Sequence, residues 1–262
     1  ERGDLQMFAT VLGGLMPMNV YRSQYVSNEP LAGALIGWVV LLAIPLLRQP
    51  ELFRLRQCVP IGLVLGLALL TKVTALLIVF PVAFAIVYAG GAGEGSARRV
   101  AARTIEALAI VLGLAALIAG WYYLRNYIEL GRPFIGGWDA ARGIEWWQDP
   151  GYRTPSQLLA FGDALIRPIF CGISSFWDGI YSTLWMDGFI SGMAELDAMP
   201  HWNYGFLFPG MWFALLPTLA ILIGLAATLS RPVKSSSSGL ILAALCVGIY
   251  FAVLLLHFST AR

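Results

Sequence analysis

The fold is decided by residues 58–89, CVPIGLVLGLALL-TK-VTALLIVFPVAFAIVYA. Lys72 carries the only charge in this stretch, and it follows Thr71 between two apolar runs. A single long helix would place Lys72 deep in hydrocarbon, at a cost of about 2.5–3.5 kcal/mol. We therefore predict a tight hairpin of two helices, 58–70 and 73–89, with Lys72 at a turn near a membrane interface.

Other apolar runs extend this pattern over the whole chain. A helix of about 20 apolar residues crosses the hydrocarbon core of a bilayer. Hydrophobic residues make up 58% of the chain and charged residues 12%, whereas soluble domains carry about 25% charged residues. The sequence predicts an all-α, polytopic transmembrane bundle of about seven spans, at residues 5–20, 31–47, 58–70, 73–89, 105–124, 206–229 and 240–258.

Arginine and lysine gather in alternate loops between these runs. With about seven spans, the basic loops 49–57, 90–104 and 230–238 all fall on one side of the membrane. The positive-inside rule makes that side cytoplasmic. The opposite side receives most of the acidic residues and the long segment 125–205. We predict transmembrane helices in 1–124, an extracytoplasmic loop in 125–205, and two further spans in 206–262.

The long outer loop is rich in tryptophan: Trp138, Trp146, Trp147, Trp177, Trp185 and Trp202. Disordered segments are poor in aromatic residues, so we expect this loop to fold. Residues 155–186 have helix-like apolar spacing that Pro168 and Gly172 interrupt. This spacing predicts one or two amphipathic helices lying in the outer interface, where tryptophan is favoured.

Charge and cysteine content exclude several classes of protein. The net charge is +2, and no basic stripe points to a nucleic-acid partner. The three cysteines form no pattern typical of a disulfide framework.

Three charged residues near expected span ends have two readings each. Glu29, followed by Pro30, is either an interfacial helix cap or a functional carboxylate that acts as a general base or metal ligand. Lys72 is either a lysine whose stem snorkels to the interface or a fixed cation for a phosphate. Arg125, at the outer end of the span 105–124, either binds a lipid phosphate or anchors the helix.

Acids alternate with aromatic residues in the outer loop, at Trp177, Asp178, Trp185 and Asp187. Carboxylates accept hydrogen bonds from sugar hydroxyls, and aromatic faces cover the apolar C–H surface of a sugar. These four residues are therefore candidates for a sugar or acceptor site. The alternative is an interfacial tryptophan belt with solvated aspartates in turns.

Four groups of short motifs follow one another along most of the chain: Met16-Pro17, residues 26–32, residues 66–72, and Trp121-Tyr122 with residues 125–127 and 131–133. In this order they resemble the polyprenyl-phosphate-dependent GT-C glycosyltransferases, in particular the bacterial protein mannosyltransferase-like and aminoarabinose-transferase-like branch. The resemblance implies a hexosyl- or pentosyltransferase of the bacterial inner membrane. Such an enzyme moves a sugar from a polyprenyl-phosphate donor to an acceptor on the periplasmic face.

The resemblance also assigns roles to residues. Glu29 matches the second of the family's two acidic positions, with Glu in place of the commoner Asp, and would be the catalytic residue or hold a divalent cation such as Mg²⁺ or Mn²⁺. Lys72 and Arg125 would bind the donor phosphate. A first helix and an acid-bearing outer loop are expected before Glu1, so we expect the chain to belong to a longer protein.

Two other functions are compatible with the same sequence. The first is a non-catalytic membrane subunit of a larger complex, built on a degenerate GT-C fold. The second is a transporter of lipids or solutes. Polar or broken helices at mid-bilayer and an internal repeat are typical of such transporters. The expected helix interiors are nearly free of charge, which favours the transporter least.

Overall fold

The computed structural model describes residues 3–24, 27–92, 96–134, 154–187, 204–230 and 238–260. These residues form α-helices and short 3-10 helices, and no strand occurs among them. The prediction of an all-α protein is therefore confirmed. The tryptophans at 138, 146, 147 and 202 lie outside the described residues.

Five helices are long and apolar enough to cross a membrane, and their composition fits a membrane-embedded protein. They coincide with five of the predicted spans and comprise Glu29–Arg48, Val73–Gly91, Ala97–Leu130, Leu207–Thr228 and Gly239–Leu256. The predicted span 58–70 is also helical, as α4 (Cys58–Thr71), but its 14 residues are short for a full crossing.

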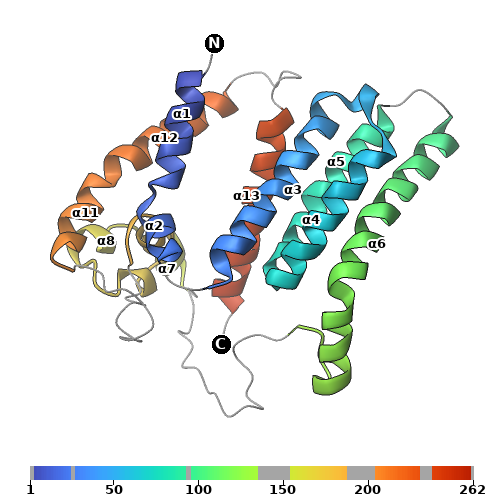
Figure 1. Ribbon diagram of the computed structural model, residues 1–262. Helices are drawn as coiled ribbons and strands as arrows, with labels where there is room; N and C mark the ends of the chain where they lie inside the picture. The colour runs from blue at the N-terminus through green and yellow to red at the C-terminus, as the bar shows by residue number, and fades with distance from the viewer. Residues whose placement is uncertain are drawn as a thin grey trace. The chain divides into compact units, whose positions relative to one another are not determined.

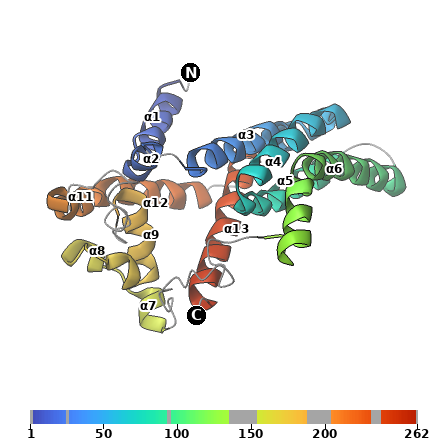
Figure 2. The ribbon, with the colours of Figure 1, turned by 60° about the horizontal axis from the view of Figure 1, so that its bottom comes forward.

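The chain divides into two compact units. We call the first the bundle unit, which consists of Asn28–Trp146 and Val233–Ala252. It contains α3 (Glu29–Arg48), α4, the 3-10 helix η3 (Val73–Ile78), α5 (Val79–Gly91), α6 (Ala97–Leu130) and most of α13 (Ser238–Thr260). Within it, α3 and α6 each pack against both α4 and α5 (Figures 1 and 2).

Small residues let α4 and α6 approach closely. A Cβ atom added at Gly62 of α4 would lie 2.9 Å from the backbone oxygen of Val111 on α6, and one added at Gly66 would lie 2.8 Å from Cβ of Ile118. Small residues at helix contacts are typical of membrane proteins, where backbones must approach closely to gain packing energy. The core around this contact is apolar, and α13 adds Leu242 and Cys246 to it.

The helix break predicted at Lys72 is confirmed. α4 ends at Thr71, Lys72 is extended with φ −155° and ψ 128°, and η3 begins at the next residue. The extended residue breaks the helical hydrogen-bond ladder, so α4 and η3 do not form one long helix. Tyr250 of α13 donates a hydrogen bond to the Thr74 carbonyl over 2.9 Å and so joins α13 to the start of η3.

Two of the predicted basic loops lie against each other at the opposite end of the bundle unit. Arg103 of α6 donates a hydrogen bond to the Phe53 carbonyl, and its guanidinium lies 5.0 Å from the centre of the Phe53 ring. This contact joins the segment after α3 to the start of α6. Arg231 and Lys234 of the third predicted basic loop lie outside the described residues.

The second compact unit consists of Glu1–Ser27, Trp147–Pro232 and Val253–Arg262. Its longer helices are α1 (Gly3–Gly14), α9 (Phe176–Trp185) and α12 (Leu215–Leu229). The shorter ones are α2 (Pro17–Ser23), α7 (Pro155–Leu159), α8 (Asp163–Ile166), η5 (Cys171–Ile173), η6 (Tyr204–Phe206) and α11 (Leu207–Phe213). α9 packs against α2, α7, α8 and α11, around a core that includes Tyr181, Trp185 and Met211.

Two predicted helical stretches are divided into shorter pieces. The stretch 5–20 forms α1 and α2, because Pro17 has no amide hydrogen and disfavours a helical conformation at Met16, whose ψ is 125°. The stretch 155–186 forms α7, α8, η5 and α9. Gly162 and Phe170 interrupt it with φ values of 141° and 59°, which no helix accommodates.

Candidate functional site

Glu29 and Lys72 meet at one end of the bundle unit. Glu29 is the first residue of α3, and Lys72 directly follows α4. The Lys72 ammonium donates a hydrogen bond to Oε1 of Glu29 and forms an ion pair with it. The Lys72 side chain is 28% exposed and the Glu29 side chain is 35% exposed. The pair therefore lies at the rim of the unit and not in its core. Both candidate residues are thus brought together, as a site shared by them requires.

Asn28 supports this arrangement. Its side-chain amide donates a hydrogen bond of 3.0 Å to the Thr71 carbonyl, one of the last carbonyls of α4, which has no partner within the helix. The start of α3 is thereby tied to the end of α4 by a neutral contact beside the ion pair. The sequence does not predict this contact, because Asn28 and Thr71 are 43 positions apart.

Aromatic residues of α6 lie at the same end of α4. Tyr123 donates a hydrogen bond of 2.6 Å to the Leu69 carbonyl, in the last turn of α4. Its ring meets the edges of Tyr122 and Phe134, with centres 5.5 and 5.6 Å apart. The sequence assigned residues of the run 121–127 a part in the family resemblance and in the two readings of Arg125, but the bond from Tyr123 to α4 was not predicted.

The predicted role of Arg125 is to bind the donor phosphate, but its partner in the structure is a carboxylate of its own helix. It forms an ion pair of 3.1 Å with Glu129, one turn further along α6, and both side chains are more than half exposed. Such exposed pairs contribute little to stability. Within the described residues, the contacts bring Glu29 and Lys72 together but do not join Arg125 to them. A phosphate-binding role for Arg125 stays a prediction.

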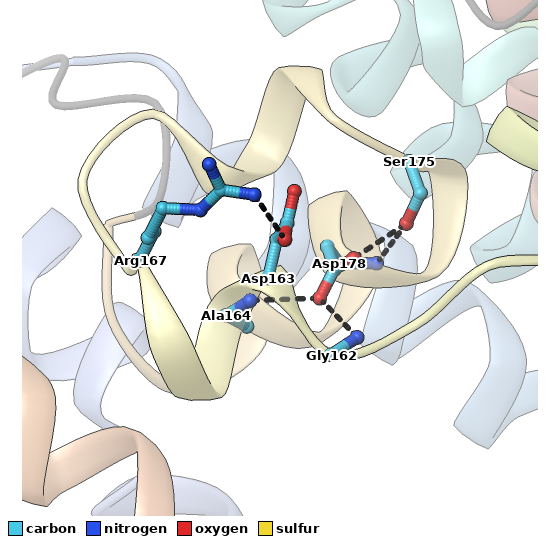
Figure 3. Close-up of polar contacts among 6 residues, drawn as sticks. All are labelled: Gly162, Asp163, Ala164, Arg167, Ser175 and Asp178. Atoms are coloured by element: carbon cyan, nitrogen blue, oxygen red, sulfur yellow. Dashed lines mark hydrogen bonds and ion pairs between the residues drawn. The ribbon is translucent and has the colours of Figure 1, made fainter.

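Asp178 is buried and its carboxylate holds the second unit together (Figure 3). Oδ1 accepts hydrogen bonds from the backbone amides of Gly162 and Ala164, at 3.0 and 2.9 Å. Oδ2 accepts one of 2.7 Å from the Ser175 hydroxyl, and Ser175 in turn caps α9 by accepting from the Asp178 amide. The aspartate thus fastens the α7–α8 connection to the start of α9, and the predicted solvated turn is replaced by a buried network.

The other three candidates of the outer loop differ in exposure. Trp177 is 40% exposed, and its ring meets the edge of Phe176. Trp185 and Asp187 are only 5% and 2% exposed. Trp177 is therefore the one member of the predicted set that presents a broad aromatic surface, which is the feature that carbohydrate contact requires.

The predicted sites belong to separate units. Glu29, Lys72 and Arg125 lie in the bundle unit, whereas Trp177, Asp178, Trp185 and Asp187 lie in the second unit. Convergence of the two sets on one cavity stays a prediction.

A divalent cation at Glu29 also stays a prediction. In the part of the chain that the structure describes, no three His, Cys, Asp or Glu side chains lie close enough to share a metal ion. Glu29 contacts the Lys72 ammonium instead, and a neighbouring positive charge opposes binding of a second cation. These residues do not fit a metal centre by themselves, and no step below is derived through one.

No protein-family model, curated protein or solved structure matches this chain. The ion pair between α3 and α4 is consequently the strongest direct indication of a functional site.

Proposed function

We propose that this chain is part of a membrane glycosyltransferase that takes its sugar from a polyprenyl-phosphate donor. The observation that carries the proposal is the Glu29–Lys72 pair, formed across 43 residues of sequence at the end of apolar helices. A carboxylate and an ammonium held side by side are the two groups that transfer from a lipid phosphate needs, one for the acceptor proton and one for the leaving phosphate.

The reaction divides between these two groups. The acceptor hydroxyl oxygen attacks C1 of the sugar, the bond from C1 to the phosphate oxygen breaks, and its electron pair leaves with polyprenyl phosphate. The carboxylate of Glu29 takes the acceptor proton. Lys72 has three N–H donors and gives one to Glu29, so two others are available for the phosphate oxygens on which negative charge develops.

The position of the pair also suits a lipid donor. Both side chains are about one-third exposed at the ends of α3 and α4, and α3 belongs to the helices that are long enough to span a bilayer. An isoprenoid tail would then lie against apolar helix surface, such as Leu31 and Trp38 of α3, which are 56% and 64% exposed. The headgroup would reach the charged pair at the interface.

Transfer by the purified full chain in liposomes tests the proposal. The donors would be polyprenyl-phosphate hexoses and pentoses, each offered with a panel of hydroxyl-bearing acceptors. The readout would be released polyprenyl phosphate, because its detection does not depend on which acceptor takes the sugar. Glu29→Gln should lower the rate by about 100-fold or more, the usual contribution of a general base. Glu51→Gln is the matched control, because Glu51 is an exposed carboxylate near the opposite end of α3.

Two results would count against the enzyme. The first is an undiminished rate in Glu29→Gln. The second is an absence of turnover with every donor in the panel, which would favour a non-catalytic membrane subunit. A thermal unfolding curve for each variant separates loss of chemistry from loss of fold, since Glu29→Gln leaves Lys72 without its carboxylate.

A further inference from the structure

Five arginines gather at the end of the bundle unit opposite to Glu29 and Lys72. Arg48 is the last residue of α3, Arg54 and Arg56 lie in the connection to α4, and Arg98 and Arg99 lie in the first turn of α6. All five are exposed. We call them the basic end; the contact between Arg103 and Phe53 holds its two parts together. The ends of α3 and α6 that carry these arginines are the upper ends in Figure 1.

The arginines of the basic end have no carboxylate partner among the described residues. Two glutamates, Glu51 and Glu106, lie in the same part of the sequence, and neither forms an ion pair with them. Glu94 lies outside the described residues. At the other end of the unit, by contrast, Lys72 pairs with Glu29 and Arg125 pairs with Glu129. Lys72 and Arg125 are therefore ion-paired at one end, whereas no described carboxylate pairs with the five arginines at the other.

The chemistry of arginine suits phosphate as the missing anion. All five positions carry arginine, as do 15 of the 17 basic positions of the chain, so what matters here is how arginine binds and not its choice over lysine. The planar guanidinium binds phosphate oxygens through two parallel hydrogen bonds. Arg98 and Arg99 also stand in the first turn of α6, where the helix dipole disfavours positive charge. A negative group bound beside them would offset that unfavourable interaction.

The surroundings indicate that this phosphate belongs to a lipid. Arg48 ends a helix apolar enough to span the bilayer, so its guanidinium lies at the level where hydrocarbon gives way to headgroups. Exposed apolar side chains continue from the arginines along both helices, including Leu41 of α3 at 63% and Ile105 of α6 at 66%. A free phosphate would make no use of this apolar surface, whereas acyl chains would cover it.

We propose that the basic end binds the phosphodiester headgroup of an anionic phospholipid. The proposal rests on the membrane-embedded character of the chain and is independent of glycosyl transfer, so either can fail alone. It gives the arginines a role beyond setting the orientation of the chain in the membrane, since a bound headgroup would fix the connection between α3 and α4 against the start of α6.

Native mass spectrometry of the purified full chain tests this proposal. The probes are phosphatidylglycerol and phosphatidylcholine with identical acyl chains, and the readout is the ratio of their binding constants. Wild type should prefer phosphatidylglycerol. The double substitution Arg98→Gln/Arg99→Gln should lower that preference by about tenfold, since each arginine near an anionic surface contributes up to about fivefold.

A charge-matched control is Arg22→Gln/Arg167→Gln, which removes two arginines from the second unit and should leave the preference unchanged. If the first double variant does not fold, the wild type still decides, because its preference must fall as salt shortens the range of electrostatic attraction. Equal binding of the two lipids by wild type, or equal loss in both double variants, would overturn the proposal. Displacement of bound phosphatidylglycerol by millimolar inorganic phosphate would reassign the site to free phosphate.

Discussion

Replacement of Gly62 by alanine tests the close contact between α4 and α6. An added Cβ would lie 2.9 Å from the backbone oxygen of Val111 and 3.0 Å from its Cα. Both atoms belong to the backbone of α6, so no side-chain rotation relieves the overlap. The two helices must move apart or bend, and the core between them must follow.

The expected cost follows from two opposing effects. Overpacking of a tight contact costs about 1–3 kcal/mol, while alanine in place of glycine favours a helix by about 0.5–1 kcal/mol. We expect Gly62→Ala to destabilise the protein by about 1–2 kcal/mol. Gly113→Ala is the control, because Gly113 lies on α6 with no atom within 4 Å of its added Cβ. It should keep the helical gain and suffer no overlap.

The assay is reversible unfolding of the purified chain in mixed micelles, followed by the loss of helical signal as denaturing detergent replaces mild detergent. The decisive quantity is the difference in unfolding free energy between the two variants, expected at about 2 kcal/mol. Gly66→Ala should resemble Gly62→Ala, because its added Cβ would lie 2.8 Å from Ile118 Cβ. Equal stability of Gly62→Ala and Gly113→Ala would refute the close approach of α4 and α6.

Two further predictions concern the second unit. Asp178→Ala leaves two backbone amides and a hydroxyl without their acceptor and should lower the unfolding free energy by about 2–4 kcal/mol. Asp163→Ala, which removes an ion pair to the exposed Arg167, is the control for thermal unfolding; equal melting temperatures would contradict a structural role of Asp178. Burial raises the pKa of the Cys171 thiol to about 11, so a maleimide at pH 8 should label it only after unfolding, because the thiolate is the nucleophile. Stability should likewise fall as pH rises from 9 towards 11, since the unfolded thiol ionises first.

Much of the bundle unit could be predicted from charge placement alone. The apolar runs defined α3, α5, α6 and α13 because hydrocarbon tolerates few charges, so each charged residue marks a span end. Lys72 located the helix break for the same reason. α6 nevertheless extends from Ala97 to Leu130, beyond the predicted 105–124 at both ends. A helix can continue beyond its apolar part into water. Hydropathy marks only the apolar part and therefore does not predict where the helix begins or ends.

Asp178 shows where prediction from local pattern reaches its limit. The sequence offered either a sugar or acceptor site or a solvated turn for it, yet its carboxylate is buried and accepts hydrogen bonds from amides 14 and 16 residues away. Those amides are presented by a break at Gly162, whose φ is 141°. No periodicity contains that information, because the contact exists only after two separate helix starts have been packed together.

The contrast between Lys72 and Arg125 has the same origin and bears on function. Both are single cations near the end of an apolar run, and the sequence alone treats them alike. Arg125 finds its carboxylate one helical turn away, in a pair that an isolated helix would form, whereas Lys72 finds Glu29 only through the packing of α3 on α4. An ion pair that exists only in the folded bundle positions its two groups with the rigidity of the helices behind them. Reactive groups need such fixed placement, and this gives Glu29 and Lys72 a stronger claim to chemistry than Arg125 has.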